Sequence, residues 1–94
     1  MKFVYFIQCG DDGPIKIGVA SDLDKRLAGL QTANHQELFL LGFIPTADAE
    51  EMEEFLHVQF DEARVRGEWF EPSRRLLDYI AGTADKVLAD RQAA

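Results

Sequence analysis

The sequence predicts an α+β fold, with a small, mostly antiparallel sheet of three strands packed by three to four helices. Two short apolar segments, 3–7 and 15–19, flank a segment rich in turn-forming residues at 9–14, which is typical of a β-hairpin. A nearly continuous apolar run at 38–44 ends at Pro45 and predicts a central strand covered on both faces. Elsewhere, apolar residues recur at helical spacing, which predicts the helices that cover this sheet.

Length and composition indicate one folded domain over residues 1–94. Apolar residues make up 47% of the chain and charged residues 29%, a balance typical of globular proteins. The single cysteine, Cys9, excludes an internal disulfide and a cysteine-rich metal site. No segment has the length of a signal peptide's apolar region or of a membrane span, so we expect a cytoplasmic protein without a membrane partner.

The predicted hairpin gathers unusual side chains on one face. If the pairing centres on residues 11–12, Tyr5 lies opposite Gly18 and Ile7 lies opposite Lys16. Because side chains alternate between the two faces of a strand, the phenol, the ammonium group and the bare glycine backbone then share a face. We therefore expect a functional site on this face of the hairpin.

A first helix is predicted from residue 23 to about residue 32. The segment beginning at Ser21 resembles a capping box, with Asp24 at the position more often taken by glutamate. Arg26 lies at the edge of the buried stripe, and Gly29 indicates close packing because glycine costs about 1 kcal/mol relative to alanine in a helix. The stripe itself recurs at i, i+4 and i+7 and consists of Leu23, Leu27 and Leu30.

A second helix is predicted to run from a cap at Thr46 to about Ala63. Beside its apolar face runs a polar stripe of Glu53, His57 and Arg64. The simplest interpretation of Glu53 and His57 is a polar pair at i and i+4, which is a weak signal for zinc without a third ligand. The apolar face comprises Ala49, Met52, Leu56, Phe60 and Ala63.

The remaining residues predict a short extended piece at 68–70 and a third helix that opens at Pro72 and Ser73 and ends at Gly82. We expect the aromatic pair at 69–70 to close the core rather than to stack on bases. The inward residues of the third helix are Leu76, Leu77 and Ile80, and those of a last helical segment are Val87 and Leu88.

The chain is acidic, with a net charge of −7 from 17 acidic and 10 basic residues. This charge argues against broad, non-specific binding to nucleic acid, which requires lysine and arginine to displace phosphate counterions. A local basic patch can still hold a polyanion, because the distribution of charge matters more than its sum.

In this order, the motifs resemble those of the GIY-YIG nuclease superfamily, especially a compact branch common in phages and bacteria. Residues 3–5 stand at its first motif, and 16–18 match the K-I-G form of its second motif. Arg26 lies in the helix that carries the family's arginine. Residues 53–57 match an E-x-x-L-H helix, and 67–70 match a G-E-W-F segment.

The resemblance covers about residues 3–72 and leaves the C-terminal helices at 73–91 outside it. Phe3 replaces the first motif's glycine, and Lys16 replaces the second motif's tyrosine. The asparagine that many members carry after the glutamate helix has no counterpart here. The resemblance implies a GIY-YIG-like fold and a metal-dependent endonuclease that hydrolyses phosphodiester bonds in DNA.

The resemblance also implies a metal site. Glu53 would bind a single Mg²⁺ or Mn²⁺, a hard ion that suits carboxylate oxygen and keeps most of its waters. Glu68 would complete the metal shell or fix Arg26. His57 would orient Glu53 or relay protons, because the ordinary pKa of histidine is near neutrality.

The other implied catalytic residues are Tyr5, Lys16 and Arg26. Tyr5 would act as a general base or orient the attacking water. Because an ordinary tyrosine pKa is near 10, base catalysis at neutral pH needs a cationic neighbour, which Lys16 would supply. Arg26 would clamp the scissile phosphate with its planar guanidinium group.

Each of these residues also has an ordinary structural interpretation. Tyr5 alone is typical of a strand residue with its ring in the core, and Lys16 and Arg26 alone are typical of solvated surface charges. The alternative function is therefore a non-catalytic module that retains the nuclease fold and binds nucleic acid or protein. A weaker alternative is an acidic phage or plasmid accessory protein that binds another protein.

We expect DNA to be bound weakly by the chain itself. Its acidic surface predicts poor intrinsic affinity for a polyanion. A partner protein or a homodimer would then supply the missing affinity for the target.

Overall fold

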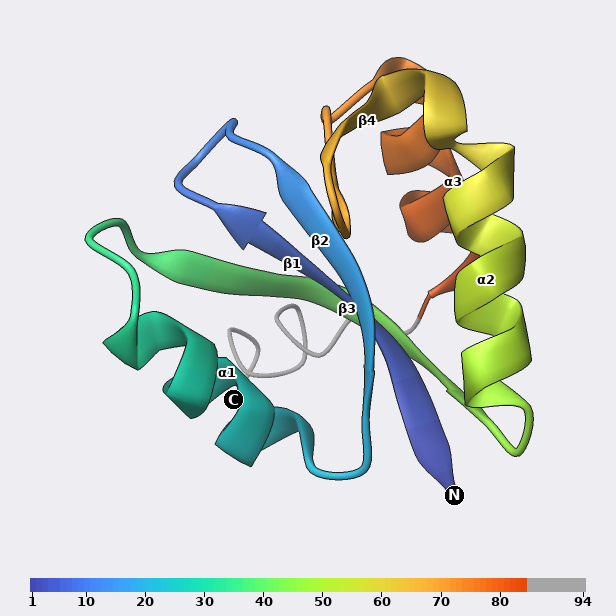
Figure 1. The fold of residues 1–94 in the computed structure, drawn as a ribbon, viewed down its shortest axis with the longest axis horizontal. Coiled ribbons are helices and arrows are strands. Elements are labelled where there is room, and N and C mark those ends of the chain that lie inside the picture. The colour runs from blue at the N-terminus through green and yellow to red at the C-terminus, as the bar shows by residue number, and fades with distance from the viewer. Residues whose placement is uncertain (85–94) are drawn as a thin grey trace.

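The computed structural model describes residues 1–84 (Figure 1). The predicted helical segment around Val87 and Leu88 lies outside the described residues. The described chain contains β1 (Lys2–Cys9), β2 (Ile15–Ala20), α1 (Leu23–Thr32), β3 (Leu38–Thr46), α2 (Ala49–Gln59), a 3₁₀ turn (Asp61–Ala63), β4 (Arg64–Arg66), β5 (Trp69–Phe70) and α3 (Arg74–Thr83).

The α+β class is confirmed, but the predicted three-stranded sheet is wrong. The strands form a five-stranded antiparallel sheet in the order β3-β1-β2-β5-β4. The two additional strands are three and two residues long. The extended piece predicted at 68–70 contains the second of them, but such short segments carry no alternating pattern that would place them in the sheet. They are joined by a tight turn in which Gly67 adopts a φ of 54°, a conformation that glycine adopts at little cost.

The predicted hairpin register is confirmed. Tyr5 pairs with Gly18, and Ile7 pairs with Lys16, across β1 and β2. The turn between the strands is closed by the backbone N–H of Cys9, which donates to the carbonyl of Pro14 at 2.9 Å. The register fixes Tyr5 and Gly18 directly opposite each other, on the face of the sheet that α1 covers.

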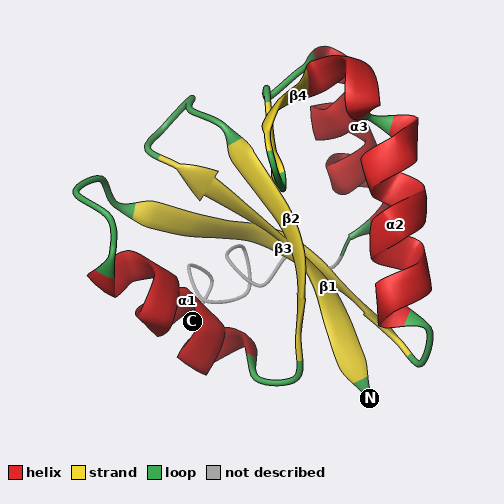
Figure 2. Cartoon of the chain, in the orientation of Figure 1, coloured by secondary structure: helices red, strands yellow, loops and turns green. Residues whose placement is uncertain are grey.

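The sheet is covered on both faces, by α1 on one side and by α2 and α3 on the other (Figures 1 and 2). Alternate strand residues therefore enter two separate cores. The larger core, beneath α2 and α3, is formed by Val4, Phe6, Ile15, Ile17, Ala49, Leu56, Phe60, Phe70, Leu76, Ile80 and Ala84. The smaller core is formed by Tyr5, Ile7, Ala20, Leu38 and Leu40, with Leu23, Leu27, Leu30 and Trp69 partly buried against it.

The first helix has the predicted bounds, but its cap differs from the prediction. Its N-cap is Asp22 rather than Ser21, and the Asp22 carboxylate accepts a hydrogen bond from the backbone N–H of Lys25 at 3.0 Å. The leucine stripe of α1 is only half-buried, since no residue of this helix is fully buried. Gly29 is exposed and has open space beside it, so the predicted close packing at this glycine is wrong.

The other two helices also differ from the prediction at their ends. Thr46 belongs to β3, and α2 starts at Ala49 and ends at Gln59. The buried Ala63 lies in the 3₁₀ turn instead. In α3, the predicted N-cap is confirmed, because the Ser73 hydroxyl accepts from the backbone N–H of Leu76 at 3.2 Å. Leu77, predicted to point inward, is 38% exposed.

None of the helices within residues 1–84 is both long and apolar enough to cross a membrane.

Candidate functional site

The candidate site lies along the outer edge of β2. The short β5 pairs with β2 only at Ile15 and Lys16, and the backbone N–H of Ile17 then donates to the carbonyl of Glu68 at 3.0 Å. Within residues 1–84, no strand pairs with the rest of this edge. Helix α2 approaches there, because Nε2 of His57 lies 3.0 Å from the carbonyl oxygen of Ile17. Side chains from β1, α1, α2 and the β4–β5 turn therefore come near one stretch of β2.

Tyr5 occupies the space that a side chain on Gly18 would need. A β-carbon built on Gly18 would overlap the hydroxyl oxygen and the ring of Tyr5. Tyr5 is only 1% exposed, so its ring cannot move aside without disturbing the core around it. The glycine that ends the K-I-G motif is thus required by the tyrosine that ends the motif on the opposite strand.

Burial raises the pKa of the Tyr5 hydroxyl above its ordinary value. The charge of Arg26 opposes this shift, the charges of Glu68 and Glu53 add to it, and a side-chain hydrogen bond from Arg26 opposes it again. The net increase in pKa keeps the phenol protonated at neutral pH. The Tyr5 oxygen accepts the hydrogen bond from Arg26 of α1, and its own proton remains to be donated.

Lys16 does not take the place that the sequence predicted for it as the cation beside Tyr5. Its Nζ donates to Oε1 of Glu68 at 2.9 Å and lies 5.5 Å from the ring centre of Trp69. The Lys16 side chain is only 15% exposed, so this ion pair is partly shielded from water. The direct electrostatic partner of Lys16 is therefore Glu68. This glutamate immediately precedes β5, and Trp69 of β5 pairs with Lys16, so Glu68 lies beside the lysine.

Two carboxylates face the same region. Glu53 is half-buried on α2, and its pKa is raised by burial and by the nearby charge of Glu68, while His57 and Lys16 oppose the shift. Two carboxylates that repel each other are both stabilised when a cation binds between them. Carboxylate oxygens are also the ligands that Mg²⁺ and Mn²⁺ prefer.

The residues present fit a hydrated ion better than a fully caged one. Among the residues that the structure describes, no group of three or more His, Cys, Asp or Glu side chains is arranged to hold a metal ion. Glu53 and Glu68 together supply two carboxylates. Mg²⁺ is commonly held by one or two carboxylates and retains several waters, so this donor set suits it.

His57 links α2 to β2. Because a carbonyl oxygen only accepts, the Nε2–H of His57 donates to Ile17, and the ring packs against Phe70 with 5.3 Å between ring centres. That nitrogen is committed to the backbone and is not available to a metal. Arg64, at the end of the predicted polar stripe, instead binds Asp61 at 2.8 Å, so the stripe does not continue into the site.

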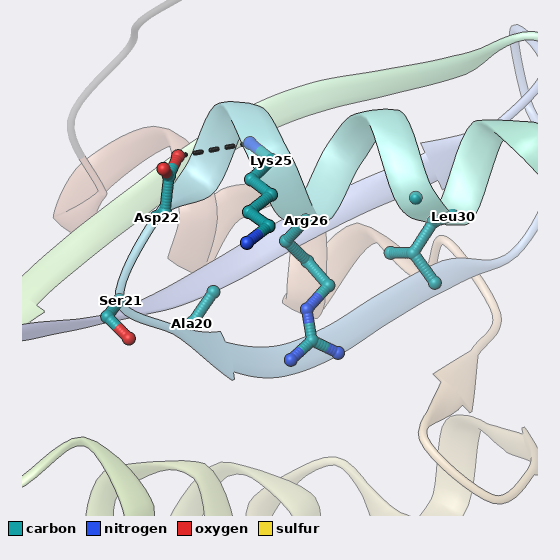
Figure 3. A pocket seen from close by; sticks show the side chains of 7 residues that line it. Ala20, Ser21, Asp22, Lys25, Arg26 and Leu30 are labelled. Carbon is teal, nitrogen blue, oxygen red and sulfur yellow. Dashed lines mark hydrogen bonds between the residues drawn. The ribbon is translucent and has the colours of Figure 1, made fainter.

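Arg26 lines a hollow beside the site (Figure 3). The side chain of Arg26 extends from α1 toward β2, and that of Lys25 toward Ala20, whereas Asp22 is bonded to the backbone nitrogen of Lys25 (Figure 3). The hollow has a volume of about 430 Å³ and is lined by residues 20–22, Lys25, Arg26, Gly29 and Leu30. Sequence reasoning did not connect Lys25 or Gly29 with Arg26, although their spacing of three to four residues places them on one side of a helix.

Comparison with known proteins identifies the family. The T5orf172 domain matches residues 2–88, which is most of the chain. This domain is found in nuclease-like proteins of phages and bacteria and is associated with nuclease-like and DNA-binding functions. No curated protein and no solved structure matches the sequence. The chain belongs to the T5orf172 domain family.

Proposed function

We propose that this protein is a metal-dependent endonuclease of the GIY-YIG type, which hydrolyses phosphodiester bonds in DNA with Mg²⁺ or Mn²⁺. The observation that carries the proposal is the convergence of charges on one phenol. Tyr5 of β1 is acted on by Arg26 of α1, by Glu53 of α2 and by Glu68 of the β4–β5 turn. The nuclease-like and DNA-binding associations of the T5orf172 family support the same function.

Phosphodiester hydrolysis requires stabilisation of negative charge on the phosphate oxygens and a positioned water. Arg26 is exposed and points toward the hollow beside β2, where its guanidinium group would bind the scissile phosphate through two parallel hydrogen bonds. Tyr5, protonated at neutral pH, would donate a hydrogen bond and so orient the phosphate or the attacking water. We therefore propose the orienting role for Tyr5 over the general-base role.

Glu53 and Glu68 would hold the metal ion through their carboxylate oxygens. When bound, a divalent ion activates water and neutralises charge on phosphate oxygens. Lys16 compensates the charge of Glu68 through their ion pair and so reduces the repulsion between Glu53 and Glu68. His57 would act as a positioning residue, because its hydrogen bond to β2 fixes the helix that carries Glu53.

Target affinity would come partly from elsewhere. The net charge of −7 opposes binding to a polyanion, so we propose that a partner protein or a homodimer holds the DNA with the chain. We propose the cytoplasm as the compartment in which the protein meets DNA.

Incubation of the purified protein with supercoiled plasmid and Mg²⁺ or Mn²⁺ tests this function. We expect conversion to the open-circular form, with loss of nicking in Glu53→Ala and in Arg26→Ala. Glu54→Ala is the matched control, because Glu54 is exposed on the same helix, next to Glu53. The proposal is refuted if the wild-type protein nicks plasmid no better than folded Glu53→Ala and folded Arg26→Ala.

The second candidate is a non-catalytic module that binds nucleic acid or protein. The raised pKa of Tyr5 favours it, because a phenol that stays protonated does not serve as a general base at neutral pH. This function predicts binding without cleavage, unaffected by chelator and by Glu53→Ala. Nicking that stops on addition of chelator would exclude it.

A further inference from the structure

The hollow beside Arg26 is lined by a glycine, Gly29, that the packing of the fold does not require. Gly29 lies one turn after Lys25 and Arg26 on the same side of α1, and it lines the hollow with them. Apart from its chain neighbours and the adjoining backbone of α1, no heavy atom of the described residues lies within 4 Å of the position where a β-carbon of Gly29 would stand. Packing within residues 1–84 therefore gives no reason for glycine, although alanine would stabilise the helix.

The hollow also has the size and the charge to take part of a nucleic-acid strand. Its volume of about 430 Å³ falls within the range of small-molecule sites, about 300–1,000 Å³. Two cations border it, and the carboxylate of Asp22 is engaged as the N-cap of α1. The Ser21 hydroxyl also lines the hollow and adds a donor of the kind that contacts phosphate (Figure 3).

We propose that this hollow is a second backbone subsite, in which the sugar–phosphate unit next to the scissile phosphate lies against Gly29 and binds Lys25. The bare helix surface at Gly29 lets the strand approach the α1 backbone closely, and the strand then reaches Arg26 directly. Glycine costs the helix stability, but a larger side chain at this position would occupy the space that the strand needs. This inference rests on the DNA-binding part of the proposed function.

Binding of a short labelled DNA, tested as duplex and as single strand in the presence of chelator, measures the subsite without cleavage. We expect Gly29→Leu to weaken binding by about tenfold. Lys25→Ala should reduce the slope of log K against log salt by about 1, the loss of one phosphate contact. Gly29→Ala should raise Tm by about 4 °C and still weaken binding, which separates contact from folding.

Gly82→Leu is the matched control, because Gly82 is also an exposed helical glycine with open space beside it, on α3. It should bind DNA as the wild type does. The subsite is refuted if folded Gly29→Leu binds like Gly82→Leu, if Lys25→Ala leaves the salt slope unchanged, or if the wild type binds neither DNA. Binding that depends on Gly29 in a protein that never nicks plasmid would refute the endonuclease and leave the subsite standing.

Discussion

The hydroxyl and ring of Tyr5 fill the space directly above Gly18, on the neighbouring strand. The two residues end the two hairpin motifs, so the motifs are complementary halves of one packing contact. Tyr5 is almost fully buried, so this contact also fixes the position of its hydroxyl group relative to the candidate site.

Gly18→Ala should therefore destabilise the protein. The added methyl group overlaps a buried ring, and overpacking of a core costs about 1–3 kcal/mol. Thermal unfolding should show a lower Tm, and the loss should shrink in a Tyr5→Val background, where the ring is absent. Gly82→Ala, with open space around it, serves as control. Equal Tm values for Gly18→Ala and the wild type would show that Tyr5 has room to move.

The raised pKa of Tyr5 predicts a loss of stability in alkali. The unfolded chain ionises near pH 10, whereas the folded tyrosine keeps its proton to a higher pH. Stability is thus fully present below about pH 10 and is lost as pH rises toward the folded pKa. The free energy of unfolding should fall less steeply above pH 10 in Tyr5→Phe than in the wild type.

Tyr79→Phe provides the comparison, because burial raises the pKa of Tyr79 as well. Each variant should remove its own part of the alkaline dependence. If Tyr5→Phe follows the wild-type curve throughout, Tyr5 is not the buried phenol that the structure describes.

The sequence could predict what depends on local pattern. The hairpin register follows from the turn and strand alternation, and it correctly places Tyr5 opposite Gly18. The extended piece predicted at 68–70 contains β5, but its place in the sheet and the strand β4 could not be predicted. Pairing with β2 stabilises β5, and pairing with β5 stabilises β4, rather than a periodicity of their own. For the same reason the partner of Lys16 was missed, because Glu68 reaches it only when β5 joins the sheet.

Glu53→Gln should change how the protein responds to metal. The raised pKa means that the folded protein carries the ionised carboxylate at a cost, and this cost is absent at low pH and appears as pH rises through the folded pKa. In chelator at neutral pH, Glu53→Gln should therefore raise Tm slightly, by about 2 °C. Added Mn²⁺ should raise the Tm of the wild type but not of Glu53→Gln.

Glu54→Gln is the matched control for charge on α2 and should respond to Mn²⁺ like the wild type. If Mn²⁺ raises the Tm of Glu53→Gln as much as that of the wild type, Glu53 is not a metal ligand. This measurement needs no substrate, so it tests the metal site separately from cleavage.

Lys16→Met should strengthen the binding of Mn²⁺ while weakening the metal-free fold. The ion pair with Glu68 is partly exposed, so its loss should lower the free energy of unfolding by about 1 kcal/mol or less. With the ammonium group gone, Glu53 and Glu68 keep their mutual repulsion without compensation, and a divalent ion relieves it. Calorimetric titration should therefore give a lower Kd for Mn²⁺ in Lys16→Met, and Glu68→Gln should cancel the gain in the double variant. If Lys16→Met binds Mn²⁺ more weakly instead, the lysine orients Glu68 for the ion rather than competing with it.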